Sequence, residues 1–381
     1  MDIKKYDLRN VIALTVIPVA GIFGTLWHIW NYGIVWQEPL LLISFWMITG
    51  LGITAGYHRL FSHRSFKAHP FIDWIMVIFA AAALQNSALK WCSDHRRHHK
   101  HLDTDKDPYS ITKGFFHAHM GWILENKPEP IEKVNDLEEK LALRFQNKYY
   151  FLLFIIFGLL IPLALGFIWG RPLGALFWGV LLRITLVHHF TYFINSICHY
   201  IGNKTYDSQS TSGDAWYISL LTFGEGYHNY HHKFQWDYRN GICWFHFDPS
   251  KWFIWFLSKI GLAKELKKAN YLQIMKARSM VIWSQIYSCL AEFPDISVQS
   301  YHQKLNALKE KIKNLEQSWK RADKEIIENI SKNRKQLISV KLFQRQKKQC
   351  KLEYKTIMKT LSVMLVSVRQ GQLLGRHTIM S

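Results

Sequence analysis

The sequence has few cysteines, and none of them forms a metal-binding pair. Five cysteines occur among the 381 residues, and no C-x-x-C motif is present. Zinc ribbons and rubredoxin-like centres are excluded, because both use such pairs as ligands. An odd number of thiols without paired spacing favours reduced cysteines in a protein that faces the cytosol. The five positions are Cys92, Cys198, Cys243, Cys289 and Cys350.

The sequence also lacks the motifs that bind redox cofactors. It has no G-x-G-x-x-G dinucleotide motif and no flavin motif, and the stretch from His69 to Ile72 lacks the glycines of a cytochrome b5-type haem site. If the protein carries out redox chemistry, its electrons must therefore come from a separate protein.

Acidic residues are scarce relative to basic ones. There are 28 Asp and Glu against 48 Lys and Arg, which gives a net charge of +20. The basic residues form no recognisable nucleic-acid-binding motif, so we expect no nucleic-acid partner. Part of the excess is the usual positive bias of cytoplasmic loops, and the rest favours anionic partners.

Long apolar runs are what the sequence has in abundance. Four runs are long enough, at about 20 residues per span, to cross a bilayer, namely residues 11–30, 39–57, 151–169 and 174–194. The fourth contains Arg183, His188 and His189, which we expect to face a protein interior, the two histidines as hydrogen-bonding groups. A fifth stretch, residues 74–84, is too short to span. We expect it to lie at the membrane interface or to pack beneath the polar region.

The basic residues predict which side of the membrane each connection faces. The turns 31–38 and 170–173 contain one arginine between them and no lysine, whereas the N-terminus, residues 59–150 and the chain after residue 194 contain nearly all the others. The positive-inside rule places these three segments in the cytoplasm. We therefore expect a multi-pass integral membrane protein of a bacterial inner membrane or the endoplasmic reticulum.

Histidine is concentrated in three clusters, all in segments predicted to be cytoplasmic. They are residues 58–63, 95–99 and 228–232, and His199 follows Asn195 by one helical turn. Histidines at i, i+3 and i+4 in the second and third clusters share one helix face. His58 and His63 would diverge on a regular helix, so we expect the helix to end or bend between them. Imidazole binds iron and zinc well, and the clusters exceed what one ion needs, so the pattern predicts a site for two metal ions.

Other polar residues receive secondary roles. We expect Asp94, Asp107 and Glu225 to hold the outer ring nitrogens of ligand histidines. A structural role is expected for His117 and His119, and a surface or packing role is expected for the remaining isolated histidines. These are His28, His69, His101, His246, His302 and His377.

Four motifs in a fixed order carry a resemblance to a known family. They are HRLFSH at 58–63, DHRRHH at 94–99, NSICH at 195–199 and EGYHNYHH at 225–232. Flanking residues agree, namely GITAG at 52–56, Gln85, Asn86 and Trp91, and FQWDYR at 234–239. Over roughly residues 43–262 the sequence resembles the integral-membrane fatty acyl desaturases of the stearoyl-CoA Δ9 type. Four ordered motifs are far more specific than any one of them.

The resemblance implies an oxidoreductase that uses O2 and two electrons to form a cis double bond, at Δ9, in a saturated long-chain acyl-CoA. It implies two Fe2+ ions per chain and a separate electron donor, such as cytochrome b5 or ferredoxin with its reductase. Asn195 would reach one metal through water, Gln85, Trp91 and Thr191 would shape the acyl tunnel, and Asn86 and Asp94 would contact substrate. The implied ligands are His58, His63, His95, His98, His99, His199, His228, His231 and His232.

Alternatives remain open at the sequence level. A membrane fatty acyl or alkane hydroxylase would use the same centre. A non-enzymatic membrane metal-binding protein is less favoured, because the ligands lie beyond the helix ends and not at mid-membrane. Ser93 and residues 123–127 supply fewer basic groups than acyl-CoA enzymes of this type, so an acyl carrier protein or an acyl lipid is an alternative to CoA.

We thus expect an all-α integral membrane protein with four transmembrane helices and a cytoplasmic helical cap that carries the di-iron site, all within residues 1–262. Residues 263–381 form a charged helical C-terminal extension without a motif of its own. A 3–4 spacing of apolar residues there predicts a short heptad seam, which pairs with another chain as a coiled coil or folds back on the catalytic domain as a core-facing helix. These residues are Leu305, Leu308, Ile312, Leu315, Trp319, Ala322 and Ile326.

Overall fold

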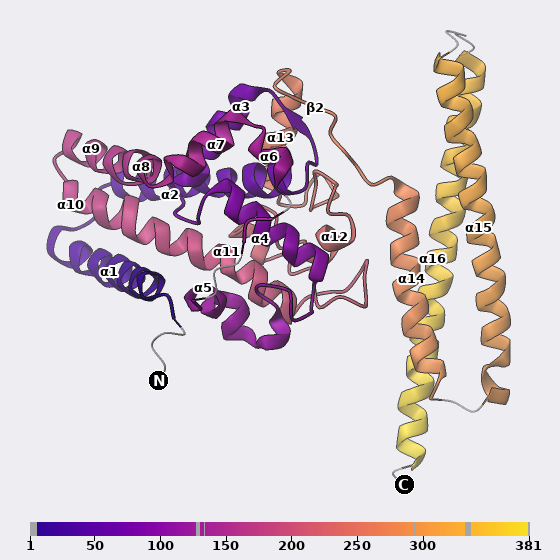
Figure 1. The fold of residues 1–381 in the computed structure, drawn as a ribbon. Helices are drawn as coiled ribbons and strands as arrows, with labels where there is room; N and C mark the ends of the chain where they lie inside the picture. The colour runs from indigo at the N-terminus through magenta and orange to yellow at the C-terminus, as the bar shows by residue number, and fades with distance from the viewer. Residues whose placement is uncertain (1–5, 127–129, 133, 293–294, 332–336, 380–381) are drawn as a thin grey trace. The chain divides into compact units, whose positions relative to one another are not determined.

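The computed structural model describes residues 6–126, 130–132, 134–292, 295–331 and 337–379, which are mostly helical (Figure 1). The strands in this part of the chain are β1 (Lys67–Ala68) and β2 (Ala263–Lys264), which pair antiparallel to each other. The predicted all-α fold is therefore confirmed. The chain forms two compact units, Met1–Ala269 and Asn270–Ser381.

Four helical segments of the first unit are long and apolar enough to cross a bilayer, and each overlaps a predicted span. The first is α1 (Leu8–Tyr32), and the second runs from α2 (Gln37–Leu51) into the π-helix η2 (Gly52–Ser62). The third combines α8 (Tyr150–Leu153), η5 (Phe154–Leu160) and α9 (Ile161–Ile168). The fourth combines α10 (Pro172–Gly174), η6 (Ala175–Leu182) and α11 (Arg183–Tyr200). The chain is a membrane protein.

Polar side chains inside the fourth segment are satisfied within the protein. The ring of His188 lies 3.0 Å from the carbonyl oxygens of Ala83 and Leu84. Arg183 is fully buried and donates to three backbone carbonyl oxygens. Its acceptors are Ala82, Gly158 and Gly179. Both residues face the interior, as predicted for polar groups at this depth.

A cap of shorter helices completes the first unit. The helix α3 (Pro70–Ala81) begins with a proline, and it packs against η2 through an apolar face that includes Ile72, Met76 and Val77. The short apolar stretch is therefore part of the core beneath the first histidine cluster. The other cap elements are α4 (Ala88–His101), η3 (Ile111–Lys113), η4 (His117–Gly121), α5 (Trp122–Leu124), α6 (Asn135–Glu138), α7 (Leu141–Lys148), η7 (Ile218–Leu220), α12 (His228–Lys233) and α13 (Pro249–Lys259).

The second unit consists of α14 (Tyr271–Leu290), α15 (Asp295–Ser331) and α16 (Leu337–Ile379). A capping box formed by Asn270 and Gln273 starts α14. The predicted apolar seam on α15 packs within this unit, where Leu305, Ile312 and Leu315 join buried residues of α14 and α16. The core-facing helix is therefore found, but α14 and α16 supply its core.

Candidate metal centre

The second candidate membrane helix carries two of the predicted ligands. Its last turns are π-helical, so the backbone N–H of His63 donates to the carbonyl oxygen of His58, five residues earlier, at 3.1 Å. The helix ends at Ser62, between the two histidines, as predicted. The divergence that a regular helix would cause is avoided, because the wider π-helical turn brings residue i+5 close to residue i. The two ring centres are 4.7 Å apart.

Helices α4 and α12 each serve two groups of histidines. On α4, the i, i+4 pair His95 and His99 belongs to one group, whereas His98 belongs to the other. The arrangement on α12 is the reverse, because its i, i+4 pair lies in the second group and its His231 lies in the first. Two short helices thus couple the positions of both groups.

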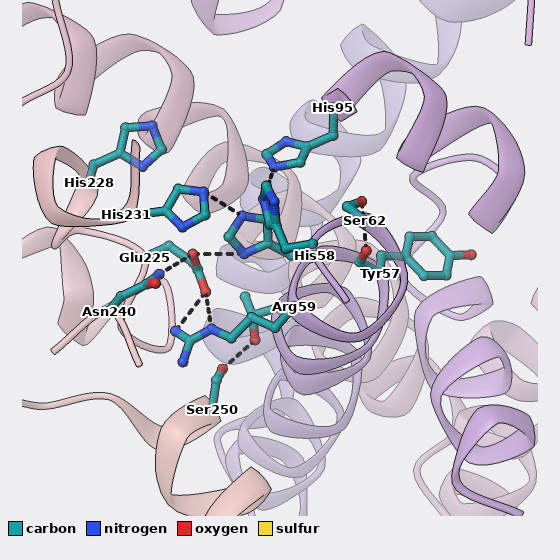
Figure 2. Close-up of polar contacts among 12 residues, drawn as sticks. Tyr57, His58, Arg59, Ser62, His95, Glu225, His228, His231, Asn240 and Ser250 are labelled. Carbon is teal, nitrogen blue, oxygen red and sulfur yellow. Dashed lines mark hydrogen bonds and ion pairs between the residues drawn. The ribbon is translucent and has the colours of Figure 1, made fainter. Parts of the chain in front are cut away.

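All nine predicted histidines come together in two groups. Within each group, the candidate ligand atoms lie within 4.8 Å of one another. Figure 2 shows His58 of η2, His95 of α4 and His231 of α12 lying close together, with His228 at the start of α12 to one side. The five-histidine group contains His58, His63, His95, His99 and His231. The four-histidine group contains His98, His199, His228 and His232.

The geometry of both groups fits metal ions. The Nε2 atoms are 3.1 Å apart in His58 and His231 and 3.0 Å apart in His199 and His228. Metal–nitrogen bonds of about 2.1 Å at right angles would separate neighbouring ligand atoms by about 3.0 Å. The buried Nε2 of His98 has no hydrogen-bond partner among the described residues. Several imidazole nitrogens that converge on one point, without enough protons to bond one another, fit a central cation.

Burial favours the neutral form of the histidines that lie outside the candidate spans. For five of them, burial is the main cause that lowers the pKa well below 6.5, and neighbouring imidazoles add to it. These are His63, His95, His99, His231 and His232. Burial likewise lowers the pKa of His228 to about 3. A neutral imidazole has the free lone pair that a metal ion requires.

In each group, one histidine has a buried carboxylate next to Nδ1, the ring nitrogen that faces away from the group. An oxygen of Glu225 lies 3.0 Å from Nδ1 of His58, and an oxygen of Asp107 lies 2.9 Å from Nδ1 of His98. Such contacts fix the tautomer and the orientation of a ligand ring. The expected positions of Glu225 and Asp107 are thus found in the structure. The third expected carboxylate, that of Asp94, pairs with the ammonium of Lys90 at 2.6 Å.

Arg59 holds the Glu225 carboxylate in place (Figure 2). Its guanidinium is 1 % exposed and lies 2.9 Å from oxygens of both Glu225 and Asp248. The amide of Asn240 donates to the second Glu225 oxygen at 2.6 Å. Burial by itself raises the pKa of Glu225, but the charges and hydrogen bonds of His58 and Arg59 outweigh it and lower the pKa to about 2. The carboxylate therefore stays ionised beside the histidine.

Three further supporting residues were not identified from the sequence. Nδ1 of His199 lies 2.8 Å from the hydroxyl of Thr211, which donates to Asp103 at 2.6 Å. The hydroxyl of Tyr109 lies 3.2 Å from Nδ1 of His95. Asp103 and Tyr109 follow the second histidine cluster closely in the sequence, so proximity could have indicated them. Thr211 has no such signal.

A cavity of about 840 Å³ lies beside the histidines and is lined by members of both groups. The hydroxyl of Thr191 accepts a hydrogen bond from Gln85 at 2.9 Å, and the Trp91 ring stacks on His95 with ring centres 5.0 Å apart. Of the nine candidate ligands, His58, His95, His98 and His228 line the cavity, and His117 and His188 also lie in its lining. The six other predicted site residues, Gln85, Asn86, Trp91, Asp94, Thr191 and Asn195, also line this cavity.

Two histidines left outside the predicted site have defined partners. His28 is 2 % exposed, and its Nε2 lies 3.3 Å from the Glu38 carboxylate, which also accepts a hydrogen bond from Arg171 at 2.9 Å. A surface role for His28 is therefore wrong, and an interior structural role is correct. His119 lies 3.0 Å from the ring of His189, outside both groups.

Comparison with known proteins adds independent information. The model of the fatty acid desaturase family matches residues 34–252, a range that contains every histidine of both groups. Acyl-CoA desaturase 1 of Saccharomyces cerevisiae is 37 % identical over 279 residues, which cover 70 % of this chain and 53 % of that protein. Stearoyl-CoA desaturase 5 of Bos taurus is 36 % identical over 281 residues, 71 % of this chain and 82 % of that protein.

This chain is also similar to a relative that is named for a lipid substrate and not for an acyl-CoA. The sn-1 stearoyl-lipid 9-desaturase of Anabaena variabilis is 37 % identical over 235 residues, 61 % of this chain and 84 % of that protein. The chain spans about half the length of the yeast acyl-CoA desaturases it matches. The helices α14, α15 and α16 lie beyond the matched family range.

Proposed function

Because the chain belongs to the fatty acid desaturase family, we propose that it is an O2-dependent desaturase that forms a cis double bond, at Δ9, in a saturated long-chain fatty acyl thioester. One observation carries the proposal: both histidine groups contribute to the lining of a single cavity. An acyl chain bound there would lie against both groups.

The five-histidine group and the four-histidine group would each hold one Fe2+ ion, with Asn195 reaching one of them through water. When bound, the two ions supply the capacity to activate O2 with two external electrons. The donor set fits iron, because imidazole binds it well, and the choice of iron among the metals that imidazole binds rests on the family. Glu225 and Asp107 would keep His58 and His98 in the metal-binding tautomer.

The residues of the cavity wall bind and orient the substrate chain. The hydrogen bond between Gln85 and Thr191 and the stacking of Trp91 on His95 fix the wall beside the metal centre. Which carbon atoms face the centre depends on the shape of this wall, since a reaction at an unactivated chain needs fixed positioning. We assign the choice of double-bond position to Gln85, Trp91 and Thr191, and substrate contacts to Asn86 and Asp94.

Basic residues in the cavity lining support a phosphate-bearing acyl carrier such as CoA. The sequence around Ser93 lacks the expected cation, and Lys127 lies outside the described residues. Four basic residues nevertheless line the cavity, namely Arg9, Lys90, Lys106 and Lys113. Two of them pair with carboxylates of the same lining, Arg9 with Asp7 and Lys90 with Asp94. Ammonium and guanidinium groups are suitable partners for phosphate. An acyl carrier protein or an acyl lipid is the alternative carrier.

The proposed topology follows from the distribution of charge. Four transmembrane helices would place the histidine cap on the cytoplasmic side of a bacterial inner membrane or the endoplasmic reticulum. A separate donor, such as cytochrome b5 or ferredoxin with its reductase, would supply electrons there. Residues 1–262 would be the desaturase domain, and residues 263–381 would be an extension outside the chemistry.

The test is the fatty acid profile of a desaturase-deficient host that expresses this chain. We expect new cis-monounsaturated fatty acids, identified by gas chromatography and mass spectrometry, with the double bond at Δ9. The His231→Ala and His98→Ala variants should insert into the membrane and give none, because each removes a ligand from one group. Products carrying a hydroxyl group would establish a hydroxylase, and full desaturation by either variant would contradict the di-iron proposal.

A further inference from the structure

The second unit, α14 to α16, has a core of its own. Buried residues from all three helices pack together, among them Ile286, Leu315 and Leu361. The matched family range ends at residue 252, before α14 begins. The core of the unit thus uses the inward faces of these helices, and the helices lie outside the matched family range.

This unit contains most of the excess positive charge of the chain. Residues 270–381 include 21 Lys and Arg against eight Asp and Glu, a net charge of +13 out of +20. The helix α16 alone has nine basic residues and one acidic residue, Glu353. Glu353 accepts a hydrogen bond from Gln349 at 2.9 Å, so its carboxylate is used locally.

The exposed face of α16 combines cations with aliphatic side chains. Seven exposed residues recur at steps of three and four, so they share one side of the helix, and together we call them the basic stripe. They are Arg345, Lys348, Leu352, Lys355, Lys359, Val363 and Val366. The aliphatic members are 52–58 % exposed. At 1.5 Å per residue the basic stripe is about 32 Å long.

The core residues of α16 lie on the opposite side of the helix from the basic stripe. At 3.6 residues per turn, they are centred half a turn away from it. They are Cys350, Tyr354, Ile357, Met358, Leu361, Met364, Leu365 and Val368. Three exposed aliphatic side chains therefore lie among the cations on the outer face of α16, an arrangement typical of a helix that lies on a membrane surface.

We propose that the basic stripe binds the surface of a bilayer that contains anionic lipid. The phosphates of the lipids would neutralise Arg345, Lys348, Lys355 and Lys359, while the three aliphatic side chains enter the boundary between headgroups and acyl chains. An acidic protein would have to offer apolar groups at the matching positions as well as negative charge, whereas an anionic bilayer surface has both along its whole extent. A second copy of the stripe would bring like charges together.

A short connection to the first unit keeps the basic stripe near the bilayer in which the first unit lies. Strand β2 (Ala263–Lys264) pairs with β1 (Lys67–Ala68), which begins five residues after the second candidate span ends at Ser62. Only residues 265–270 separate β2 from α14, a tether of about 20 Å when extended. A short tether to a membrane-embedded unit raises the effective concentration of the basic stripe near lipid.

The test is site-resolved lysine acetylation of the full-length protein in lipid nanodiscs. One set of discs contains phosphatidylcholine only, and the other contains about 30 % phosphatidylglycerol to supply negative surface charge. We expect Lys348, Lys355 and Lys359 to react at least about threefold more slowly in the anionic discs, with the difference lost in about 1 M salt, where the Debye length falls to about 3 Å. The matched controls are three exposed lysines of α15, namely Lys309, Lys311 and Lys320.

A double variant separates the two parts of the proposal. Val363→Ser with Val366→Ser keeps every charge of the basic stripe and should reduce the protection, because the stripe then has fewer groups that enter the lipid. Unchanged protection would show that these residues do not insert. Equal reactivity in both discs, or equal protection of the α15 lysines, would overturn the lipid site. Protection that requires an added acidic protein, or that grows with protein concentration, would assign the stripe to a protein partner or a second copy. None of these readouts depends on desaturation.

Discussion

A buried carboxylate supports each histidine group, and the two carboxylates contact different rings. Glu225 contacts His58 of the five-histidine group, whereas Asp107 contacts His98 of the four-histidine group. Removing an outer partner of this kind typically lowers metal affinity by about 10–100-fold. We therefore expect Glu225→Gln and Asp107→Asn each to retain about one metal ion per chain under chelator conditions in which the wild type retains two.

Elemental analysis of the purified variants measures this directly. The matched control is Asp136→Asn, because Asp136 bonds Arg96 at 2.7 Å and belongs to neither histidine group. Its metal content should equal that of the wild type. Full metal content in both test variants would show that the outer carboxylates do not hold the ligands, and loss of both ions from each would show that the groups are not independent.

Asp214 makes stability depend on pH. It accepts a hydrogen bond from the backbone N–H of Tyr230 at 3.1 Å, in the first turn of α12. Burial raises the pKa of Asp214 to about 7, although the hydrogen bonds to backbone N–H groups oppose it. The folded state then binds the proton more tightly than the unfolded state does. The stabilisation of the fold by protonated Asp214 is therefore full below pH 4 and is lost as the pH rises through 7. Between pH 6 and 8 the loss is about 1 kcal/mol.

Asp214→Asn tests this assignment, because asparagine keeps the acceptor oxygen and does not titrate. Thermal unfolding of the detergent-solubilised proteins at pH 6 and pH 8 gives the comparison. The wild type should lose more stability than the variant over this interval. Parallel changes in the two proteins would mean that Asp214 does not titrate there.

At the scale of the element, η2 joins the membrane helix to the metal centre. A Cβ placed on Gly52 would lie 2.5 Å from the backbone nitrogen of Ala80, so the close approach of η2 to α3 needs a glycine here. We expect Gly52→Ala to push the two helices apart, at a cost of about 1–3 kcal/mol, and to lower metal content by displacing His58. Thermal unfolding and elemental analysis check both effects.

Gly24→Ala in α1 is the comparison. A Cβ there would meet the ring of Phe177, a side chain that can rotate, and α1 contributes no histidine to either group. This variant should keep its metal. Similar metal loss in both variants would mean that packing anywhere among the candidate membrane helices, and not the approach of η2 to α3, controls the centre.

Most of the candidate ligands could be predicted, because they occur in short clusters whose spacing along a helix is regular. Histidines at i, i+3 and i+4 must share a helix face, and all nine candidates do converge. Spacing could not assign the residues to groups, because α4 and α12 each contribute to both groups. It predicted a helix end or bend between His58 and His63, but not that η2 is π-helical. Nor could it identify Arg59, whose charge is typical of an exposed residue and is buried only because Glu225 and Asp248 arrive from distant segments.

The elements were easier to predict than their contacts. Apolar runs located all four candidate spans, because their length is set by the bilayer. The basic residues of the cavity were missed, since Arg9 and Lys106 come together only in the folded chain. The apolar spacing on α15 predicted a buried face without its partner, and packing against α14 and α16 supplied one.

At the scale of the whole molecule, the parts needed for chemistry lie in one compact unit. Both histidine groups, their supporting residues and the cavity lie between residues 7 and 248, within the unit that ends at Ala269. The remaining helices have a separate core. We therefore expect a chain that ends at Ala269 to insert, to retain the metal content of the full chain and to give the same fatty acid products in the host.

Metal analysis and fatty acid profiling of that truncated chain decide the point together. Full metal content with full product would assign the chemistry to the first unit and leave α14 to α16 to other roles, such as the lipid contact proposed for the basic stripe. Full metal content with little product would instead place a contribution to electron delivery or substrate access in the second unit. Loss of metal from the truncated chain would contradict the division, because no residue after Ala269 belongs to a histidine group in the described parts of the chain.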